Sequence, residues 1–345
     1  MRLLIITQAV DLGDPVLGFF HRWIEELATC FERIHVICLF EGRHNLPKNV
    51  FVHSLGKDKG ASRIGYVWNF YKLIWTLRSE YDAVFVHMNQ EYVLLGWKLW
   101  WLLRKPVYLW RNHYAGSFLT DLAAVFCRNV FCTSRFSYTA KYKKTRLMPI
   151  GIDTETFVPL TIERKNSVLS LGRIAPSKRP ELLVEAISLL KKEGIEVHAD
   201  VYGDALAQNV AYFQSLQNTV RERGLSSLVQ FHSGISNRET PRVYSAHSIF
   251  VNASGSGMYD KTIFEAAACG CLVLAASKDW ASIADPALSF EEGNAHDLAH
   301  KIKALYTLPD SEAKQLQEAS RQVAETQSLG RLVDALQNVI TAAVT

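Results

Sequence analysis

The sequence predicts an α/β protein of two Rossmann-like domains, each a doubly wound parallel sheet, that face each other across a cleft. Its 345 residues exceed what one ordinary domain needs and suffice for two, each with its own hydrophobic core. Short apolar runs of strand length alternate with helical patterns of ten or more residues, which indicates βα units and parallel sheets. The alternation is interrupted once near the middle of the chain and then restarts.

The first half of the chain carries the first series of βα units. Strands are expected at 2–10, 35–40, 50–54, 83–87 and 107–110, and helices at 18–31, 64–78 and 92–103. Ligands of open parallel sheets bind at the carboxyl ends of the strands. The residues that directly follow each strand are therefore the candidates for function.

The second half repeats the pattern. Strands are expected at 168–171, 197–202, 229–232, 249–251 and 271–275, and helices at 179–193, 210–223, 238–246 and 261–268. Pro159 and a polar stretch suggest a hinge near 155–166. We therefore expect an N-terminal Rossmann-like domain over 1–158 and a second Rossmann-like domain over 159–327. The amphipathic segment 328–345 needs an apolar partner, which the first domain can supply.

A basic loop follows the first strand of the second half, in the sequence SLGRIAPSKRP at 170–180. Gly172 permits close approach of the backbone to a ligand, and Arg173 and Lys178 can hold a diphosphate by charge-assisted hydrogen bonds. The alternative interpretation is an ordinary solvated basic loop.

A glycine-rich loop at 254–259 leaves another strand and enters a helix. The first turn of that helix is expected at Asp260, Lys261, Thr262 and Ile263, where unpaired N–H groups and the helix dipole favour an anion. Glu265 lies one turn further, in position to accept hydrogen bonds from a ribose diol. The alternative interpretation is a βαβ unit without a ligand.

These motifs resemble the signature of the family-four (group 1) retaining glycosyltransferases of the GT-B fold. The family pattern is a Glu, seven residues, a second Glu, and a run of small residues that ends in Gly. The Gly-Arg…Lys loop, the strand that ends at Gly203, and the segments 148–157 and 231–254 are also similar to family motifs. The resemblance implies that a hexosyl group passes, with retention of configuration, from a nucleotide-diphosphate sugar to a glycan or lipid-linked acceptor in glycoconjugate or polysaccharide synthesis.

One position departs from the family pattern. Glu265 matches the second Glu, but Gly257 stands where the family has the first, which contacts the transferred sugar. Asp260 or Lys261 can take over that contact. Two alternatives to a transferase stay open: a sugar-nucleotide epimerase of the same fold, and a catalytically degenerate nucleotide-binding homologue.

The resemblance also implies roles for residues after other strands. His87 matches a His that the family places beside the donor sugar, and with Arg173 and Lys178 it completes the expected catalytic set. Arg111 and His113 match a His-bearing loop on the acceptor side, and Gly18 lies where the family has its first glycine-rich loop. Gly203 and Ile235 are expected among the donor-binding residues, with main-chain contacts to the base near Asp204 and Gly234-Ile235.

Charge is unevenly distributed between the two halves. Residues 1–165 carry 22 lysine and arginine residues against 14 acidic ones, and the remainder carries 16 against 20. The stretch 92–110 interleaves four Trp residues with three cations. It predicts either a buried helix with basic ends or a helix that lies on an anionic membrane surface.

Several classes are excluded or disfavoured. The chain shows neither the pattern of a secretory signal nor a long uncharged apolar run, so we expect a cytoplasmic protein, peripheral at the inner face of the membrane if the membrane interpretation holds. Asp-x-Asp and Cys-x-x-Cys motifs are missing, so we expect no metal and no cofactor. The resemblance implies a UDP- or GDP-linked sugar as the substrate, with 159–327 as the nucleotide-sugar-binding domain and 1–158 as the acceptor-side domain. A dehydrogenase and a nucleic-acid-binding protein are disfavoured.

Overall fold

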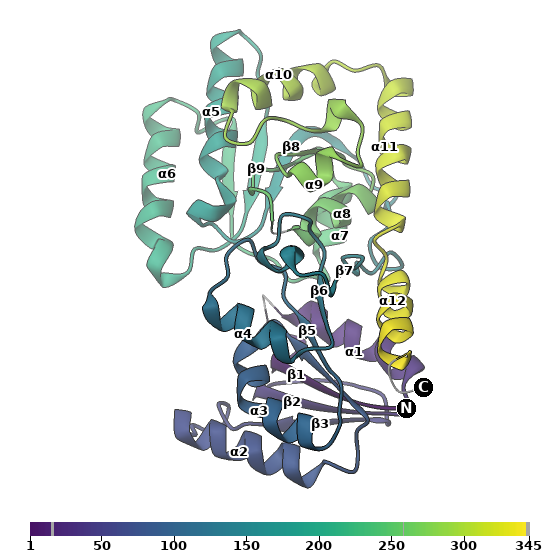
Figure 1. Cartoon of the computed structure of the whole chain (residues 1–345). Helices are drawn as coiled ribbons and strands as arrows, with labels where there is room; N and C mark the ends of the chain where they lie inside the picture. The colour runs from purple at the N-terminus through teal and green to yellow at the C-terminus, as the bar shows by residue number, and fades with distance from the viewer. Residues whose placement is uncertain (15–16, 258, 343–345) are drawn as a thin grey trace. The chain divides into compact units, whose positions relative to one another are not determined.

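The computed structural model describes residues 1–14, 17–257 and 259–342. The chain forms two compact units, Met1–Gly151 together with Leu329–Thr345, and Ile152–Ser328 (Figure 1). Each unit contains one sheet whose strands are all parallel. The α/β fold class with two Rossmann-like units is confirmed.

The first unit has a seven-stranded sheet of order β3-β2-β1-β4-β5-β6-β7. Its elements are β1 (Arg2–Val10), α1 (Gly18–Cys30), β2 (Arg33–Glu41), β3 (Val50–Ser54), α2 (Arg63–Thr76), β4 (Ala83–His87), α3 (Gln90–Leu102), β5 (Val107–Trp110), α4 (Phe118–Phe126), β6 (Asn129–Cys132), the 3₁₀ turn η1 (Tyr138–Lys141), β7 (Thr145–Leu147) and α12 (Leu329–Thr341). The sequence patterns predicted the first five strands and missed β6, β7 and α4.

Alternation of side chains along the strands divides the core of the first unit into two layers. Leu3 and Ile5 of β1 face a cluster formed with α1 and α12, whereas Leu4 and Ile6 face a cluster formed with α2, α3 and α4. The apolar face of α12 thus has its partner in the first unit. The helices α2, α3 and α4 share the opposite face of the sheet.

The second unit has a five-stranded sheet of order β10-β9-β8-β11-β12. Its elements are β8 (Lys165–Leu171), η2 (Pro176–Lys178), α5 (Pro180–Lys192), β9 (Ala199–Tyr202), η3 (Ala207–Asn209), α6 (Val210–Glu222), β10 (Val229–His232), α7 (Thr240–Ser245), β11 (His247–Asn252), α8 (Lys261–Ala268), β12 (Leu272–Ala275), α9 (Lys278–Ala281), η4 (Pro286–Leu288), α10 (Ala295–Tyr306) and α11 (Asp310–Glu325). The strand order reverses between β8 and β11, so this is the topological switch point of the sheet.

The boundary between the units lies earlier than the sequence patterns place it. Gly151 packs within the first unit, where its carbonyl oxygen accepts a hydrogen bond of 3.0 Å from Trp23. Phe157 is buried in the second unit and packs against Tyr244. Residues 152–158 therefore belong to the second unit, not to the first. Spacing alone could not show this, because the assignment depends on contacts with residues far along the chain.

The predicted hinge segment is also fixed within the second unit. The Arg164 guanidinium donates to the carbonyl oxygens of Ser245, Cys269 and Gly270 at 3.2, 3.1 and 2.5 Å. A cation that binds the last carbonyl groups of α7 and α8 stabilises both helix ends. Arg164 therefore holds the start of β8 against these two helices.

Candidate functional site

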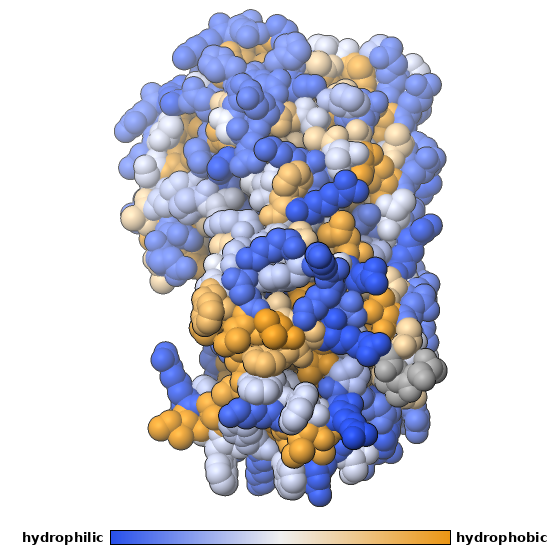
Figure 2. Space-filling view, viewed as in Figure 1, coloured by the Kyte–Doolittle hydropathy of each residue, from blue (hydrophilic) through white to orange (hydrophobic). Residues whose placement is uncertain are grey.

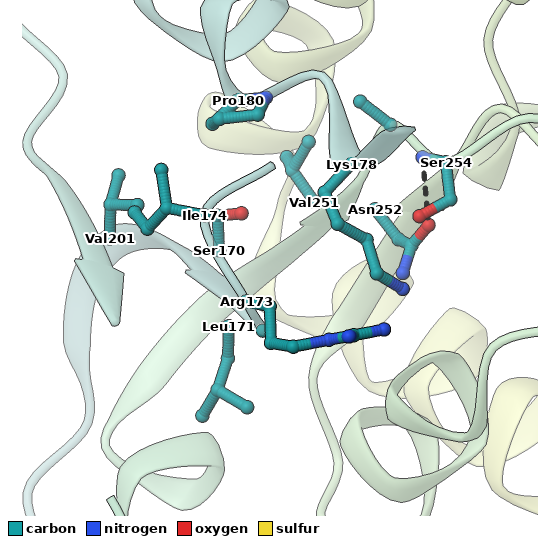
Figure 3. Close-up of a pocket in the computed structure, with 12 residues that line it drawn as sticks. Ser170, Leu171, Arg173, Ile174, Lys178, Pro180, Val201, Val251, Asn252 and Ser254 are labelled. Carbon is teal, nitrogen blue, oxygen red and sulfur yellow. Dashed lines mark hydrogen bonds between the residues drawn. The ribbon is translucent and has the colours of Figure 1, made fainter. Parts of the chain in front are cut away.

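A pocket opens at the switch point of the second sheet, where the carboxyl ends of β8 and β11 lie side by side (Figure 3). It is lined by Ser170, Leu171, Gly172, Arg173, Ile174, Lys178, Pro180, Val201, Val251, Asn252, Ala253 and Ser254. The two loops that the sequence patterns selected, which begin at 170 and at 254, thus lie together: both contribute to the pocket lining, and Lys178 pairs with Asp260. Open α/β sheets bind ligands at this position.

The loop after β8 needs glycine at its base. Gly172 has a φ of 150° and Gly203, after the neighbouring strand β9, has a φ of 155°. A Cβ atom on Gly203 would lie 1.9 Å from the carbonyl oxygen of Gly172. The two backbones approach each other so closely that no side chain fits between them.

We expect Gly203→Ala to destabilise the second unit by about 2 kcal/mol or more, because the backbone must move to relieve the clash. Gly194→Ala is the matched control, since Gly194 also has positive φ (77°) but no atom within 4 Å of the position that a Cβ would occupy. Urea unfolding of both variants measures the difference. Equal stability of the two variants would show that the contact between Gly172 and Gly203 is unimportant.

Two cations lie at the mouth of the pocket. The Arg173 side chain is exposed and makes no hydrogen bond or ion pair with any residue that the structure describes. Lys178, in the short η2 turn, is less exposed, and its ammonium pairs with the carboxylate of Asp260. Both side chains line the pocket together with Asn252 (Figure 3). Among the described residues, the Arg173 guanidinium is therefore unpaired, whereas the Lys178 ammonium is paired with Asp260.

Asp260 occupies the N-cap position of α8, as the sequence predicted for the start of this helix. Its Oδ2 accepts hydrogen bonds from Asn252 Nδ2 at 3.0 Å and from the Ser254 hydroxyl at 3.3 Å. Burial disfavours its ionised form, but the Lys178 ammonium and these donors outweigh burial and hold the pKa of Asp260 below its ordinary value. Asn252 Nδ2 also donates to Thr262 Oγ1 at 3.1 Å. Asn252 thus connects the end of β11 to the first turn of α8.

Glu265 lies one turn into α8, where its side chain is almost fully buried. Its Oε2 accepts a hydrogen bond of 3.2 Å from the hydroxyl of Tyr244. Burial raises the pKa of Glu265 to about 7, although the charge of Lys261, one turn earlier, acts in the opposite direction. Burial likewise lowers the pKa of Lys261. Ile263, in contrast, directs its side chain into the core, so only its main chain can contribute to an anion site.

A third carboxylate stands beside the glycine-rich loop, and the sequence patterns did not identify it. Glu292 accepts hydrogen bonds from the N–H and hydroxyl of Ser256, at 3.4 and 3.3 Å, and pairs with Arg179 at 3.4 Å. Gly257 has a φ of 91°, a conformation that favours glycine. The backbone at this position therefore disfavours the Glu of the family pattern, and Glu292 places a carboxylate next to the same loop.

The loops after β9 and β10 also meet at the carboxyl edge of the second sheet. A Cβ atom on Gly234 would lie 2.6 Å from Oδ2 of Asp204, so the two loops are in contact. Ile235 is half-buried beside them, and the rings of Tyr202 and His232 stack with centroids 4.3 Å apart. Gly203 and Ile235 therefore lie on neighbouring loops at the carboxyl edge of the second sheet.

His87, at the end of β4, lies in the core of the first unit. It is 2% exposed, and its ring stacks on Phe20 with a centroid separation of 3.9 Å. Its Nδ1 lies 3.3 Å from the hydroxyl of Thr7 on the neighbouring strand β1. The prediction that His87 touches a substrate remains a prediction, and in this conformation aromatic rings enclose its imidazole.

Arg111 and His113 follow β5 at the same edge of the first sheet. Arg111 donates to the carbonyl oxygen of Met88 at 3.4 Å, and its buried Nε has no hydrogen-bond partner among the described residues. His113 Nδ1 accepts from the N–H of Ala115 at 2.9 Å. Gly18 begins α1, and its N–H donates to the carbonyl oxygen of Asp14 at 3.0 Å.

The predicted residues thus fall into two groups. The structure brings Arg173, Lys178, Asp260, Thr262 and Glu265 together at the switch point of the second unit. His87, Arg111, His113 and Gly18 all belong to the first unit.

The described part of the chain contains no cluster of three His, Cys, Asp or Glu residues with the geometry of a metal site. Within residues 1–14, 17–257 and 259–342, no helix combines the length and the hydropathy needed to cross a bilayer.

Comparisons with known proteins identify a family for the second unit. Residues 152–323 match the model of the family described as glycosyl transferases group 1. The mannosylfructose-phosphate synthase of Agrobacterium fabrum is 28% identical over 147 residues, which are 39% of this chain and 32% of that protein. The D-inositol 3-phosphate glycosyltransferase of Mycolicibacterium smegmatis is 27% identical over 197 residues, 54% of this chain and 44% of that protein. The chain thus spans less than half of the length of these two relatives.

Solved structures are similar along the whole chain. Anabaena Alr3699/HepE in complex with UDP has a TM-score of 0.81 at 18% identity, with 99% of this chain and 100% of that chain covered. The sucrose-phosphate synthase of Thermosynechococcus elongatus has a TM-score of 0.75 at 17% identity, with 99% of both chains covered. Such low identities show the fold alone, and that fold is GT-B. Because its second unit matches the family model and its whole length has this fold, the chain belongs to the group 1 glycosyltransferases.

Proposed function

We propose that the protein transfers a hexosyl group from a UDP- or GDP-linked sugar to an acceptor hydroxyl, with retention of the anomeric configuration. One observation carries the proposal: Arg173, Lys178 and the first turn of α8 converge at the switch point of the second unit, with Glu265 one turn inside the helix. Two cations and a helix N-terminus match the charge of a pyrophosphate. The complex of HepE with UDP, at 18% identity, supports this fold as a nucleotide-binding one.

The chemistry that these residues support is stabilisation of the leaving group. As the bond between the anomeric carbon and the phosphate oxygen breaks, negative charge develops on the diphosphate. We propose that Arg173 and Lys178, which both line the pocket, stabilise that charge. The acceptor oxygen forms the new bond on the same face of the sugar, and its proton passes to the departing phosphate oxygen. The chain's own cations then perform the neutralisation for which other enzymes use a metal, so we propose a metal-independent reaction without a cofactor.

Asp260 holds the Lys178 ammonium in position before the donor binds. Its carboxylate pairs with the ammonium and is itself held by Asn252 and Ser254. The lysine side chain is thereby positioned at the pocket, and little side-chain entropy is lost when a phosphate binds. We further propose that Asp260, Lys261 or Glu292 contacts the transferred sugar in place of the Glu that Gly257 replaces.

The nucleoside is expected on the carboxyl side of β9 and β10. Glu265 accepts hydrogen bonds from the ribose hydroxyls, and the main chain near Gly203 and Ile235 contacts the base. On the acceptor side we propose Arg111 and His113, with a glycan or lipid-linked acceptor in glycoconjugate or polysaccharide synthesis. A lipid-linked acceptor would require the protein to work at the inner face of the membrane.

A ligand panel tests this function. Purified protein is titrated calorimetrically with UDP-, GDP- and ADP-sugars, and the donor that binds is incubated with and without candidate acceptors. We expect tight binding of one nucleotide class and release of the nucleoside diphosphate only when an acceptor is present. The product should have the anomeric configuration of the donor, as determined by NMR. Isomerised donor without any acceptor would identify an epimerase. Binding without turnover for any acceptor would identify a non-catalytic homologue.

A further inference from the structure

The outward face of α2 in the first unit is apolar, which is the reverse of an ordinary surface helix. Ile64, Trp68 and Trp75 are 83%, 71% and 52% exposed. Their spacing places them on one side of the helix, whereas Phe70 and Ile74 are fully buried on the other. The core therefore leaves a second apolar stripe uncovered on α2.

Further apolar side chains are exposed on α3 and α4, the neighbouring helices of the same sheet face. Trp101 and Leu102 at the end of α3 are 77% and 69% exposed, and Phe118 at the start of α4 is 74% exposed. An apolar groove lies between the end of α3 and the end of α4. Figure 2 shows hydrophobic residues gathered over the regions of α2 and α4.

Contacts between the helices hold α2, α3 and α4 side by side on this face of the sheet. The Tyr71 hydroxyl of α2 donates to the Leu95 carbonyl oxygen of α3 at 3.0 Å. Trp97 of α3 stacks on Phe126 of α4 with ring centroids 4.1 Å apart and an interplanar angle of 5°. We call this surface the aromatic face and define it by Ile64, Trp68, Trp75, Trp101, Leu102 and Phe118.

Cations accompany the aromatic face. Arg63, Lys72 and Arg78 lie on or beside α2, which contains no acidic residue. The guanidinium of Arg78 lies 4.4 Å from the ring centroid of Trp75. On α3 and at its end, the cations are Lys98, Arg104 and Lys105, against the single acid Glu91.

We propose that the aromatic face inserts into the headgroup region of an anionic bilayer. Exposed Trp rings among Lys and Arg side chains are typical of segments that lie in this region, where the rings are partly desolvated and the cations reach the phosphates. An acidic protein would satisfy the cations but would leave the exposed Trp, Ile and Leu side chains in water. An anionic bilayer accommodates both the cations and the apolar side chains. This complementarity of charge and polarity is why we propose a bilayer and not an acidic protein. The proposal goes beyond sugar transfer and does not require it.

Cosedimentation of the full chain with vesicles tests the proposal. Vesicles rich in phosphatidylglycerol are compared with vesicles of pure phosphatidylcholine, at low and high salt. We expect binding to the anionic vesicles that falls steeply with salt. Trp68→Ser combined with Trp101→Ser, and separately Arg63→Glu combined with Lys72→Glu, are each expected to weaken vesicle binding at least about tenfold. All four side chains are exposed, so the variants retain the core.

Leu206→Ser combined with Val210→Ser is the matched control, because these two exposed apolar residues lie in the second unit. Its vesicle binding should equal that of the wild type. Absence of vesicle binding by the wild type at low salt would overturn the proposal. A dimer in solution that the Trp68 and Trp101 changes dissociate, again without vesicle binding, would assign the face to a second copy of the chain and would also overturn it. Titration of the same variants with nucleotide distinguishes a loss of vesicle binding from a failure of the proposed catalytic function.

Discussion

Replacing Lys178 with methionine is expected to lower the turnover number for sugar transfer by roughly 100- to 1000-fold, the usual cost of removing one preorganised group that stabilises transition-state charge. Methionine keeps the unbranched shape and most of the length of the side chain and removes its charge. The effect should appear mainly in turnover, because charge on the diphosphate grows as the glycosidic bond breaks. Steady-state kinetics with the donor identified in the ligand panel measures it.

The pair with Asp260 requires a second variant. Lys178→Met alone leaves the Asp260 carboxylate without its counter-charge, and a buried unpaired charge can destabilise a protein by several kcal/mol. Lys178→Met combined with Asp260→Asn removes both charges. We expect this double variant to fold, as judged by circular dichroism, and to stay at least 100-fold slower than the wild type.

Arg173→Ala provides an independent check, since the Arg173 side chain is exposed and its removal leaves no buried charge. The same direction of change is expected in turnover. Lys192→Ala, at the exposed end of α5, is the matched control and should transfer sugar at the wild-type rate. Near wild-type turnover in both Arg173→Ala and the folded double variant would rule out a role for these cations in catalysis.

The second large effect is expected for Glu265→Ala, which should weaken nucleotide diphosphate binding by roughly 10- to 100-fold, since hydrogen bonds to a charged group contribute about 1.5–3 kcal/mol. Glu265→Gln keeps one accepting oxygen and should lose less. Burial raises the pKa of Glu265, so its carboxylate is protonated at a higher pH than that of an exposed glutamate. The loss of affinity caused by Glu265→Ala should therefore be larger at pH 8 than at pH 6.

Deoxynucleotides distinguish a contact with ribose from a general effect on the pocket. Titration calorimetry should show that Glu265→Ala weakens binding of the ribonucleotide more than that of the same nucleotide without its ribose hydroxyls. Equal weakening of both ligands would indicate that Glu265 supports the fold around Tyr244 and does not bind the ribose.

Much of the second unit was predictable because its signals are local. The strand-to-helix transition at α8 follows from a glycine-rich loop, an N-cap residue and a run of small apolar residues, all within 254–268. The meeting of the loops after β8 and β11 follows from the rule that parallel strands present their carboxyl ends at one edge.

Contacts between residues far apart in the sequence were not predictable. Lys178 and Asp260 are 82 positions apart, and neither spacing nor composition indicates that they pair. The same holds for Glu292, which approaches the glycine-rich loop from the segment before α10. The burial of His87 depends on Phe20, which belongs to a different βα unit.

The tryptophan-rich stretch shows a third kind of limit. A buried helix and an interfacial helix are the two alternatives that the sequence leaves for 92–110, and burial within this stretch is mixed. Trp100 is fully buried, whereas the adjacent Trp101 is 77% exposed. The exposed apolar side of α2 was not predicted from the sequence. A helix with apolar residues on two sides gives no indication of which side packs against the sheet and which side stays exposed.

A crystal structure of the protein with the bound nucleoside diphosphate shows where the pyrophosphate binds. We expect the two phosphates within hydrogen-bond distance of Arg173, Lys178 and the main chain at the start of α8, with the ribose hydroxyls on Glu265. A nucleotide bound at any other place, with the switch-point pocket of the second unit empty, would contradict this expectation.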